Sequence, residues 1–176
     1  MKEIVLFGDS LLGRFNNNLI DQLEQTIPSS NVYNCAAGGW NSNDGIKRVE
    51  YIAMLSPDVV VLSFGANDTA PWKEQVALST FIQNMEFMVR TFTKAKVIVL
   101  LCPHVSVESP EQTKEFNNSL DMYNEAIRRI CDEHHAVYID SDGLLVNLDD
   151  YHEDDGVHLN QAAYDLIIEG IGRKTQ

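Results

Sequence analysis

Short runs rich in β-branched residues alternate along the chain with longer stretches of helical periodicity, and this alternation is what most limits the possible folds. The run Val59-Val60-Val61-Leu62 is apolar on both faces, as expected for a strand of a parallel sheet that is covered by helices on both sides. The predicted strands are Glu3 to Phe7, Asn31 to Asn34, Asp58 to Phe64, Lys96 to Leu101 and Val137 to Asp140. The order predicts an α/β fold, a three-layer α/β/α sandwich with about five parallel strands.

Apolar residues that return at three- and four-residue steps predict the helices between these strands. The two clearest helices cover Trp72 to Phe92 and Phe116 to His134, and weaker patterns cover Leu12 to Ile27, Ser42 to Leu55 and Asn160 to Ile171. The longest stretches without such a pattern are Cys102 to Gln112 and Ser141 to Val157, which we expect to be surface loops.

The size and charge of the chain narrow the classes of function. A length of 176 residues with 44% apolar composition suits one buried core, so we expect a single domain spanning residues 1–176. The formal net charge of −13 repels nucleic-acid phosphates and anionic lipid head groups. Nucleic acid is therefore not an expected partner, and the sequence gives no indication of the oligomeric state.

Cysteine usage and hydropathy point to a protein of the cytoplasm. Cys35, Cys102 and Cys131 are odd in number and widely spaced, which fits neither a disulfide framework nor a paired-cysteine zinc site, so buried thiols are expected. No apolar run is long enough for a signal peptide or a bilayer span. We therefore expect a soluble, cytoplasmic protein without membrane insertion.

Polar and glycine-rich segments follow the predicted strands. Because the carboxyl ends of parallel strands meet at one edge of a sheet, where ligands bind, these segments should lie together. They are Gly8-Asp9-Ser10, Ala36-Ala37-Gly38-Gly39, Gly65-Ala66-Asn67-Asp68 and, before the last predicted helix, Asp154 to His158.

These segments contain the parts of a serine nucleophile. The hydroxyl of Ser10 attacks an acyl carbon usefully only if a nearby base takes its proton. In Asp155-Gly156-Val157-His158 a carboxylate and an imidazole are three residues apart, so one turn of chain can bring the carboxylate of Asp155 to one ring nitrogen of His158. The other nitrogen would then face Ser10, with His158 as base and Asp155 as its orienting acid.

Attack on a carbonyl creates an oxyanion, which needs hydrogen-bond donors at the place where the charge develops. Three donors are candidates: the backbone N–H of Ser10 at a strand-to-helix turn, the backbone N–H of Gly39 in a glycine pair, and the side-chain amide of Asn67. We expect no cofactor and no metal for this chemistry.

At these residues the chain resembles the GDSL/SGNH hydrolases, a family of serine esterases and lipases. Gly8-Asp9-Ser10-Leu11 resembles the first family block, Asn34 to Gly39 the second, Gly65 to Asp68 the third and Asp155 to His158 the last. The resemblance implies a flavodoxin-like fold and the same site residues. The second block departs from the family, which often has glycine where this chain has Ala36; this leaves Gly38 beside Gly39 as a donor, although counting from Asn34 favours Gly39.

Each motif has a simpler alternative. Ser10 could cap the helix that follows it, Gly38-Gly39 could be a tight turn, and Asn67-Asp68 could cap the next helix. Of the other histidines, His104 could line the pocket or be structural, and His134 is expected to be packed.

Two other functions use the same edge of the sheet. One is metal-dependent phosphoester hydrolysis, in which acidic, amide and imidazole side chains would hold a divalent ion. Its candidate ligands are Asp9, Asn67, Asp68, His152, Asp154, Asp155 and His158. The other is a non-catalytic ligand-binding domain on the same scaffold.

The predicted substrate is a small-molecule carboxylic ester that forms an acyl-serine intermediate. Aromatic and apolar residues beside the motifs favour short acyl or acetyl groups, and the two tryptophans could instead stack on a sugar ring. These candidate wall residues are Trp40, Phe64, Trp72 and Leu159. The family resemblance also admits acetylated carbohydrates, thioesters and lysolipids as substrates. A local cationic patch could come from Arg14, Lys47 or Arg48.

Overall fold

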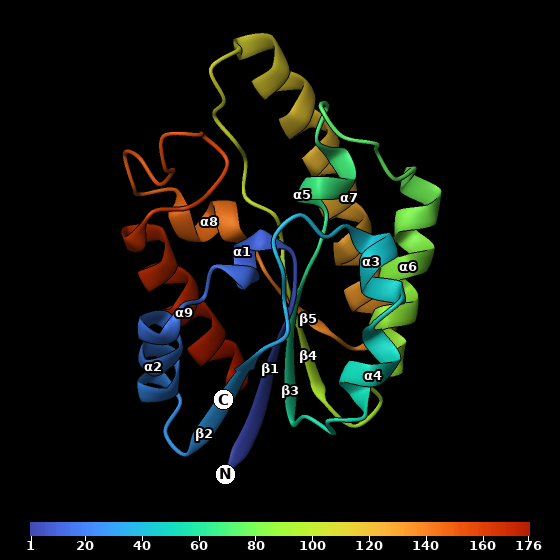
Figure 1. Ribbon diagram of the computed structural model, residues 1–176, viewed down its shortest axis with the longest axis vertical. Coiled ribbons are helices and arrows are strands. Elements are labelled where there is room, and N and C mark those ends of the chain that lie inside the picture. Colours follow the sequence, from blue (N-terminus) through green and yellow to red (C-terminus); the bar gives the residue numbers. More distant parts are fainter.

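Five parallel strands form one sheet in the computed structural model, which describes all of residues 1–176 (Figure 1). The strand order is β2-β1-β3-β4-β5, the order of flavodoxin-like sheets. The strands are β1 (Lys2–Gly8), β2 (Ser30–Asn34), β3 (Val59–Ser63), β4 (Lys96–Leu100) and β5 (Val137–Ile139). The α/β fold predicted from the sequence is confirmed.

Helices cover both faces of the sheet. In Figure 1, α2, α8 and α9 lie on one side of the strands and α3, α4, α6 and α7 on the other. The helices are α1 (Ser10–Gly13), α2 (Asn17–Thr26), α3 (Ser42–Ile46), α4 (Val49–Ala53), α5 (Ala66–Thr69), α6 (Leu78–Thr91), α7 (Pro110–His134), α8 (Ser141–Leu145) and α9 (Gln161–Thr175). None of them combines the length and hydropathy that a membrane span requires.

The strands are apolar throughout because each face of the sheet packs against its own core. Along β1, Ile4 and Leu6 belong to the core beneath α2 and α9, whereas Val5 and Phe7 belong to the core beneath α4, α6 and α7. This alternation follows from the two-residue period of a strand. Each core contains 20 buried residues, so neither face of the sheet is left uncovered.

Two of the weaker predicted helices are each divided in two. The span expected from Leu12 to Ile27 consists of α1 and α2, because the side chain of Asn16 accepts a hydrogen bond from the N–H of Leu19 and starts a new helix. The span expected from Ser42 to Leu55 consists of α3 and α4, which are separated at residues 47–48. The apolar periodicity is right in both cases, but it does not reveal the breaks.

The helix expected from Trp72 begins only at Leu78, so that prediction is wrong for residues 72–77. This segment folds back on α5, where the N–H of Lys73 donates to the carbonyl of Ala70 at 3.0 Å and the N–H of Val76 donates to that of Asp68 at 3.0 Å. Val76 is nevertheless buried, which explains why it fitted the helical pattern.

The two predicted loops are shorter than expected. The first ends at Ser109, whose side chain caps α7, with Pro110 in the first turn. The second begins with α8, which Asp140 caps and whose Leu145 is fully buried.

All three cysteines are free; Cys102 and Cys131 are buried as predicted, whereas Cys35 is partly exposed.

Candidate active site

The four motif segments meet at the carboxyl edge of the sheet, beside the point where the strand order reverses between β1 and β3. Ser10 begins α1 directly after β1, and Asn67 lies in α5 directly after β3. The loop between α8 and α9 brings His158 and Asp155 to the same place. Together with Gly39, these residues border one cavity of about 490 Å³. A ligand site at this position is typical of such sheets.

A continuous chain of polar contacts joins Ser10, near the start of the polypeptide, to His158 and Asp155, near its end. The Nε2 atom of His158 lies 3.2 Å from the Oγ atom of Ser10, and its Nδ1 atom is hydrogen-bonded to Oδ2 of Asp155. The other carboxylate oxygen, Oδ1, accepts the N–H groups of Val157 at 2.9 Å and His158 at 2.8 Å. The turn Asp155-Gly156-Val157-His158 therefore fixes the carboxylate against the imidazole within four residues.

These hydrogen bonds keep Asp155 ionised. Partial burial alone would raise the pKa of its carboxyl group, but the side chain of His158 and the two backbone N–H groups stabilise the anion and lower the pKa to about 2. Asp155 is therefore an anion at every pH at which the protein is expected to work.

Ser10 does not cap the helix that it begins. Asp9 is the N-cap residue of α1, and its Oδ1 atom accepts the N–H of Leu11 at 2.9 Å. The hydroxyl of Ser10 is thereby left to face His158. The alternative role of Ser10 as a cap is wrong, since the residue before it takes that role.

The candidate oxyanion donors line the same cavity. Ser10 occupies the first position of a helix, where the backbone N–H has no acceptor within the helix. Gly39 has a φ of 83°, and its N–H makes no hydrogen bond within the protein. The Nδ2 atom of Asn67 donates one hydrogen to the carbonyl of Trp40 at 2.8 Å, which leaves its second hydrogen available. Gly38 borders the cavity as well.

Two further motif residues hold these segments in place. The Nδ2 atom of Asn34 donates to the carbonyls of Leu12 at 3.0 Å and Phe15 at 3.2 Å, which joins the second block to the end of α1. Asp68 is buried, and its carboxylate accepts the N–H of Ser42 at the start of α3. Asp68 thus stabilises the start of α3 and does not cap the helix that follows it in sequence.

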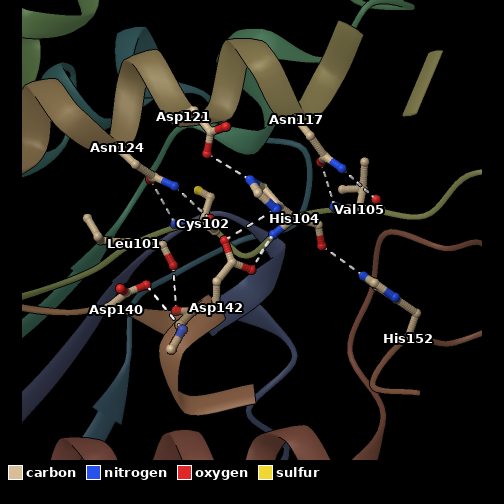
Figure 2. A network of polar contacts seen from close by, with 12 residues as sticks. Leu101, Cys102, His104, Val105, Asn117, Asp121, Asn124, Asp140, Asp142 and His152 are labelled. Atoms are coloured by element: carbon tan, nitrogen blue, oxygen red, sulfur yellow. Dashed lines mark hydrogen bonds and ion pairs between the residues drawn. The ribbon is translucent and has the colours of Figure 1, made fainter. Parts of the chain in front are cut away.

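A network of hydrogen bonds around His104 anchors the loop that carries His158 (Figure 2). The ring of His152 donates from Nε2 to the carbonyl of His104 at 2.8 Å, and the N–H of Ser106 donates to the carbonyl of Gly156 at 2.7 Å. Gly156 has a φ of 69°, and a Cβ atom there would lie 1.9 Å from the carbonyl oxygen of Ser106. The two loops approach so closely that only glycine fits.

His104 does not line the cavity. Its ring lies 2.7 Å from Oδ1 of Asp121, and its backbone N–H donates to Oδ1 of Asp142 at 2.9 Å. Figure 2 shows both partners around His104. The structural alternative for His104 is therefore the right one. His134 is half-buried and pairs with Glu86 on α6 at 3.0 Å, so it packs as predicted.

Only one of the four expected wall residues borders the cavity. Trp72 does so, with its ring edge-on to Phe116 at 5.2 Å between centroids. Trp40 lies instead beneath the guanidinium of Arg48 at 4.1 Å, and Phe64 and Leu159 are buried in the two cores. The prediction is wrong for Trp40 and Phe64, because proximity in sequence to a motif does not determine which face a side chain takes, whereas Leu159 lines a smaller pocket beside Ser10 and His158.

Two cations border the cavity in a chain that is otherwise acidic. Arg14 was a candidate from the sequence and forms an ion pair of 2.7 Å with Glu153.

Lys73 was not among the candidates from the sequence, because residues 72–77 were assigned to a helix. The Nζ atom of Lys73 donates to Oδ1 of Asn67 at 2.6 Å. Pro71 could have indicated the break, but proline is also common in the first turn of a helix. The other two candidate cations, Lys47 and Arg48, both pair with Asp44 and do not border the cavity.

The residues that were proposed as metal ligands do not converge as a set. Asp68 is engaged with Ser42, and His152 is engaged with His104. The side chains whose ligand atoms lie within 4.8 Å of one another are Glu153, Asp155 and His158; of these, His158 contacts Ser10 and Asp155 contacts His158.

Asp9 is a buried acid whose charge destabilises the fold. Its Oδ2 atom has no hydrogen-bond partner and the residue is 1% exposed. Burial raises the pKa of its carboxyl to about 7; the N–H of Leu11 lowers it, and the carboxylate of Asp68 raises it further. The folded protein therefore keeps a proton that the unfolded chain, with a carboxyl pKa near 3.8, releases. The stability that this proton provides is greatest below pH about 4 and is lost as pH rises towards 7.

Asp9→Asn should remove this pH dependence, because an amide mimics the protonated carboxyl at every pH. Between pH 5 and pH 8, the free energy of unfolding of Asp9→Asn should rise relative to that of the natural protein by roughly 3 kcal/mol. Urea titrations of both proteins at the two pH values measure this difference. An equal change in both proteins between the two pH values would contradict the raised pKa.

Comparisons with known proteins agree on the family. The model of the GDSL-like lipase/acylhydrolase family matches residues 6–166. A lipase/acylhydrolase from Enterococcus faecalis is 26% identical, with a TM-score of 0.88 over 99% of this chain and 95% of that chain. No curated protein sequence matches the chain.

Two solved structures of lower identity share the fold. A catalytic mutant of an acetylxylan esterase from Geobacillus stearothermophilus has a TM-score of 0.79 at 18% identity, over 98% of this chain and 93% of that chain. An α/β hydrolase from the metagenome of Lake Arreo, Spain, has a TM-score of 0.81 at 18% identity, over 99% of this chain and 94% of that chain. With the family model covering almost the whole chain, the protein belongs to the GDSL-like lipase/acylhydrolase family and is an ester hydrolase.

Proposed function

We propose that the protein is a serine esterase that cleaves short-chain carboxylic esters through an acyl-Ser10 intermediate. The observation that carries this proposal is the unbroken chain of contacts from Asp155 through His158 to the hydroxyl of Ser10. This chain lies at a cavity that also presents Gly39 and Asn67. A nucleophile, a base and an acid in hydrogen-bonding order are what acyl transfer to serine requires.

The reaction proceeds in two halves. His158 takes the proton of Ser10 as Oγ attacks the ester carbonyl, and Asp155 stabilises the imidazolium that forms. The oxyanion of the tetrahedral intermediate accepts hydrogen bonds from Ser10 N–H, Gly39 N–H and the free hydrogen of Asn67 Nδ2. His158 then gives the proton to the departing alcohol. Water, deprotonated by His158, attacks the acyl-serine, and the collapse of the second intermediate releases the acid and returns the proton to Ser10.

The shape of the cavity supports short acyl groups. Its apolar surface near Ser10 is limited to a few side chains, of which Trp72 and Phe116 are the largest, and the cavity is open to solvent. A long acyl chain would therefore leave most of its surface in water and gain little from apolar burial. Acetyl to butyryl groups fit this surface, and the half-exposed ring of Trp72 could stack on a sugar that carries the ester.

A series of p-nitrophenyl esters from acetate to decanoate tests this function. We expect the highest kcat/KM for acetate to butyrate, a steady decline with longer chains, and no change when a chelator is added. Acetylated xylo-oligosaccharides form a second panel, in which Trp72→Ala should raise the KM if the indole stacks on a sugar.

The second candidate function is metal-dependent phosphoester hydrolysis, because Glu153, Asp155 and His158 lie close together. Release of p-nitrophenol from a phosphodiester tests it. That function predicts cleavage of bis-p-nitrophenyl phosphate that a chelator abolishes and a divalent metal restores. Saturable binding of esters without any turnover would instead indicate a non-catalytic domain. Either outcome would overturn the esterase proposal.

A further inference from the structure

Building on the proposed esterase function, we propose that Lys73 is a positioning residue for the reaction, which orients and polarises the amide of Asn67 so that this amide binds the oxyanion more strongly. Lys73 lies outside the four motif blocks, in the segment between α5 and α6. The inference deepens the proposed function by adding a residue that acts on the oxyanion through another side chain.

The amide of Asn67 is held at both ends. The Nζ atom of Lys73 donates to its Oδ1 atom at 2.6 Å, and its Nδ2 atom donates to the carbonyl of Trp40 at 2.8 Å. An ammonium group can only donate and a carbonyl oxygen can only accept. The two partners therefore permit one orientation of the amide, with the oxygen towards Lys73 and the NH₂ group towards Trp40.

The backbone that carries Lys73 is fixed against α5. The N–H of Lys73 donates to the carbonyl of Ala70 at 3.0 Å, and two residues on, the side chain of Gln75 donates from Nε2 to the carbonyl of Thr69 at 2.9 Å. The N–H of Val76 then donates to the carbonyl of Asp68 at 3.0 Å. These three hydrogen bonds hold the segment against the helix that contains Asn67. The backbone of Lys73 is therefore fixed at a place from which its side chain reaches the amide.

Lys73 forms no ion pair, although its charge acts electrostatically on the buried carboxyl of Asp9. No carboxylate lies within ion-pairing distance of its Nζ atom, whereas the other cation of the cavity, Arg14, is paired with Glu153. An ammonium group that donates to the amide oxygen draws electron density from the amide nitrogen. The free N–H of the amide therefore becomes a stronger hydrogen-bond donor. A stronger donor stabilises an oxyanion more than it stabilises a neutral ester carbonyl. Lys73 is therefore expected to stabilise the transition state more than the bound substrate.

A double-mutant cycle with Lys73→Met and Asn67→Ala tests the inference on p-nitrophenyl acetate, a neutral substrate. Lys73→Met should lower kcat by about 5- to 10-fold at nearly constant KM, because the lost interaction is stronger in the transition state than in the bound substrate. In the Asn67→Ala background, the same change should have no further effect, since the group that it acts through is absent. Lys73→Arg, which keeps the charge and the donors, should recover most of the lost kcat.

Lys47→Met is the matched control, because Lys47 is an exposed lysine that pairs with Asp44 and does not border the cavity. It should leave kcat unchanged. A change in KM without a change in kcat for Lys73→Met, or an equal loss in the natural and Asn67→Ala backgrounds, would overturn the inference. If Asn67→Ala cripples hydrolysis and Lys73→Met does not, only the role of Lys73 fails. If Asn67→Ala and Ser10→Ala both leave hydrolysis intact, the proposed function fails.

Discussion

Ser10→Ala is expected to lower kcat for p-nitrophenyl acetate by about 10⁶-fold, because no other nucleophile lies within reach of His158. The small residual rate would come from the oxyanion donors and from substrate binding alone. The measurement is the steady-state rate of p-nitrophenol release, corrected for spontaneous hydrolysis.

Ser106→Ala is the control for this change. Ser106 is exposed, it lies in the loop that contacts Gly156, and its contact to that residue uses the backbone N–H rather than the hydroxyl. Its replacement should leave kcat within a factor of about two, since no hydrogen bond of the serine side chain is lost. A Ser10→Ala protein that kept a substantial share of the natural kcat would show that another group performs the attack.

Asp155→Asn is expected to lower kcat by about 10⁴-fold with little loss of stability. The amide occupies the same volume and can still accept the N–H groups of Val157 and His158 through its oxygen. It can, however, turn its NH₂ group towards Nδ1 of His158, which favours the tautomer that presents a proton, instead of a lone pair, to Ser10. The variant also lacks the anion that stabilises the imidazolium.

The neighbouring carboxylate provides the control for Asp155→Asn. Asp154 is exposed and makes no side-chain hydrogen bond, so Asp154→Asn should retain nearly full activity while removing the same formal charge. Equal losses in the two variants would attribute the effect to the overall charge of the loop and would contradict the assigned role of Asp155. Because the pKa of Asp155 is about 2, its ionisation should not limit activity at any pH above about 4.

The sheet and the meeting of the motif segments could be predicted from the sequence because both depend on short-range signals. The strands are recognisable from their continuous apolar character, which the two cores require. Once the strands are parallel, the residues after β1 and β3 must share an edge. The turn that joins Asp155 to His158 spans only four residues, so its geometry is also local.

The details that could not be predicted depend on contacts between segments that are distant in sequence or on competing local preferences. Trp72 to Val76 fit a helical pattern, and only the hydrogen bonds to α5 divert them into the loop that carries Lys73. The role of Asp9 as cap of α1 was hidden because Ser10 is itself a good cap residue. The anchoring of the α8–α9 loop by His104 and His152 joins segments 48 residues apart, and no motif marks it.

A fluorophosphonate probe tests directly the claim that Ser10 is the activated nucleophile of the proposed reaction. The natural protein, treated with the probe and digested with a protease, should show by mass spectrometry a single adduct on the peptide that contains Ser10, and His158→Ala should label far more slowly. An adduct on a different serine, or equal labelling of the natural protein and His158→Ala, would contradict the claim.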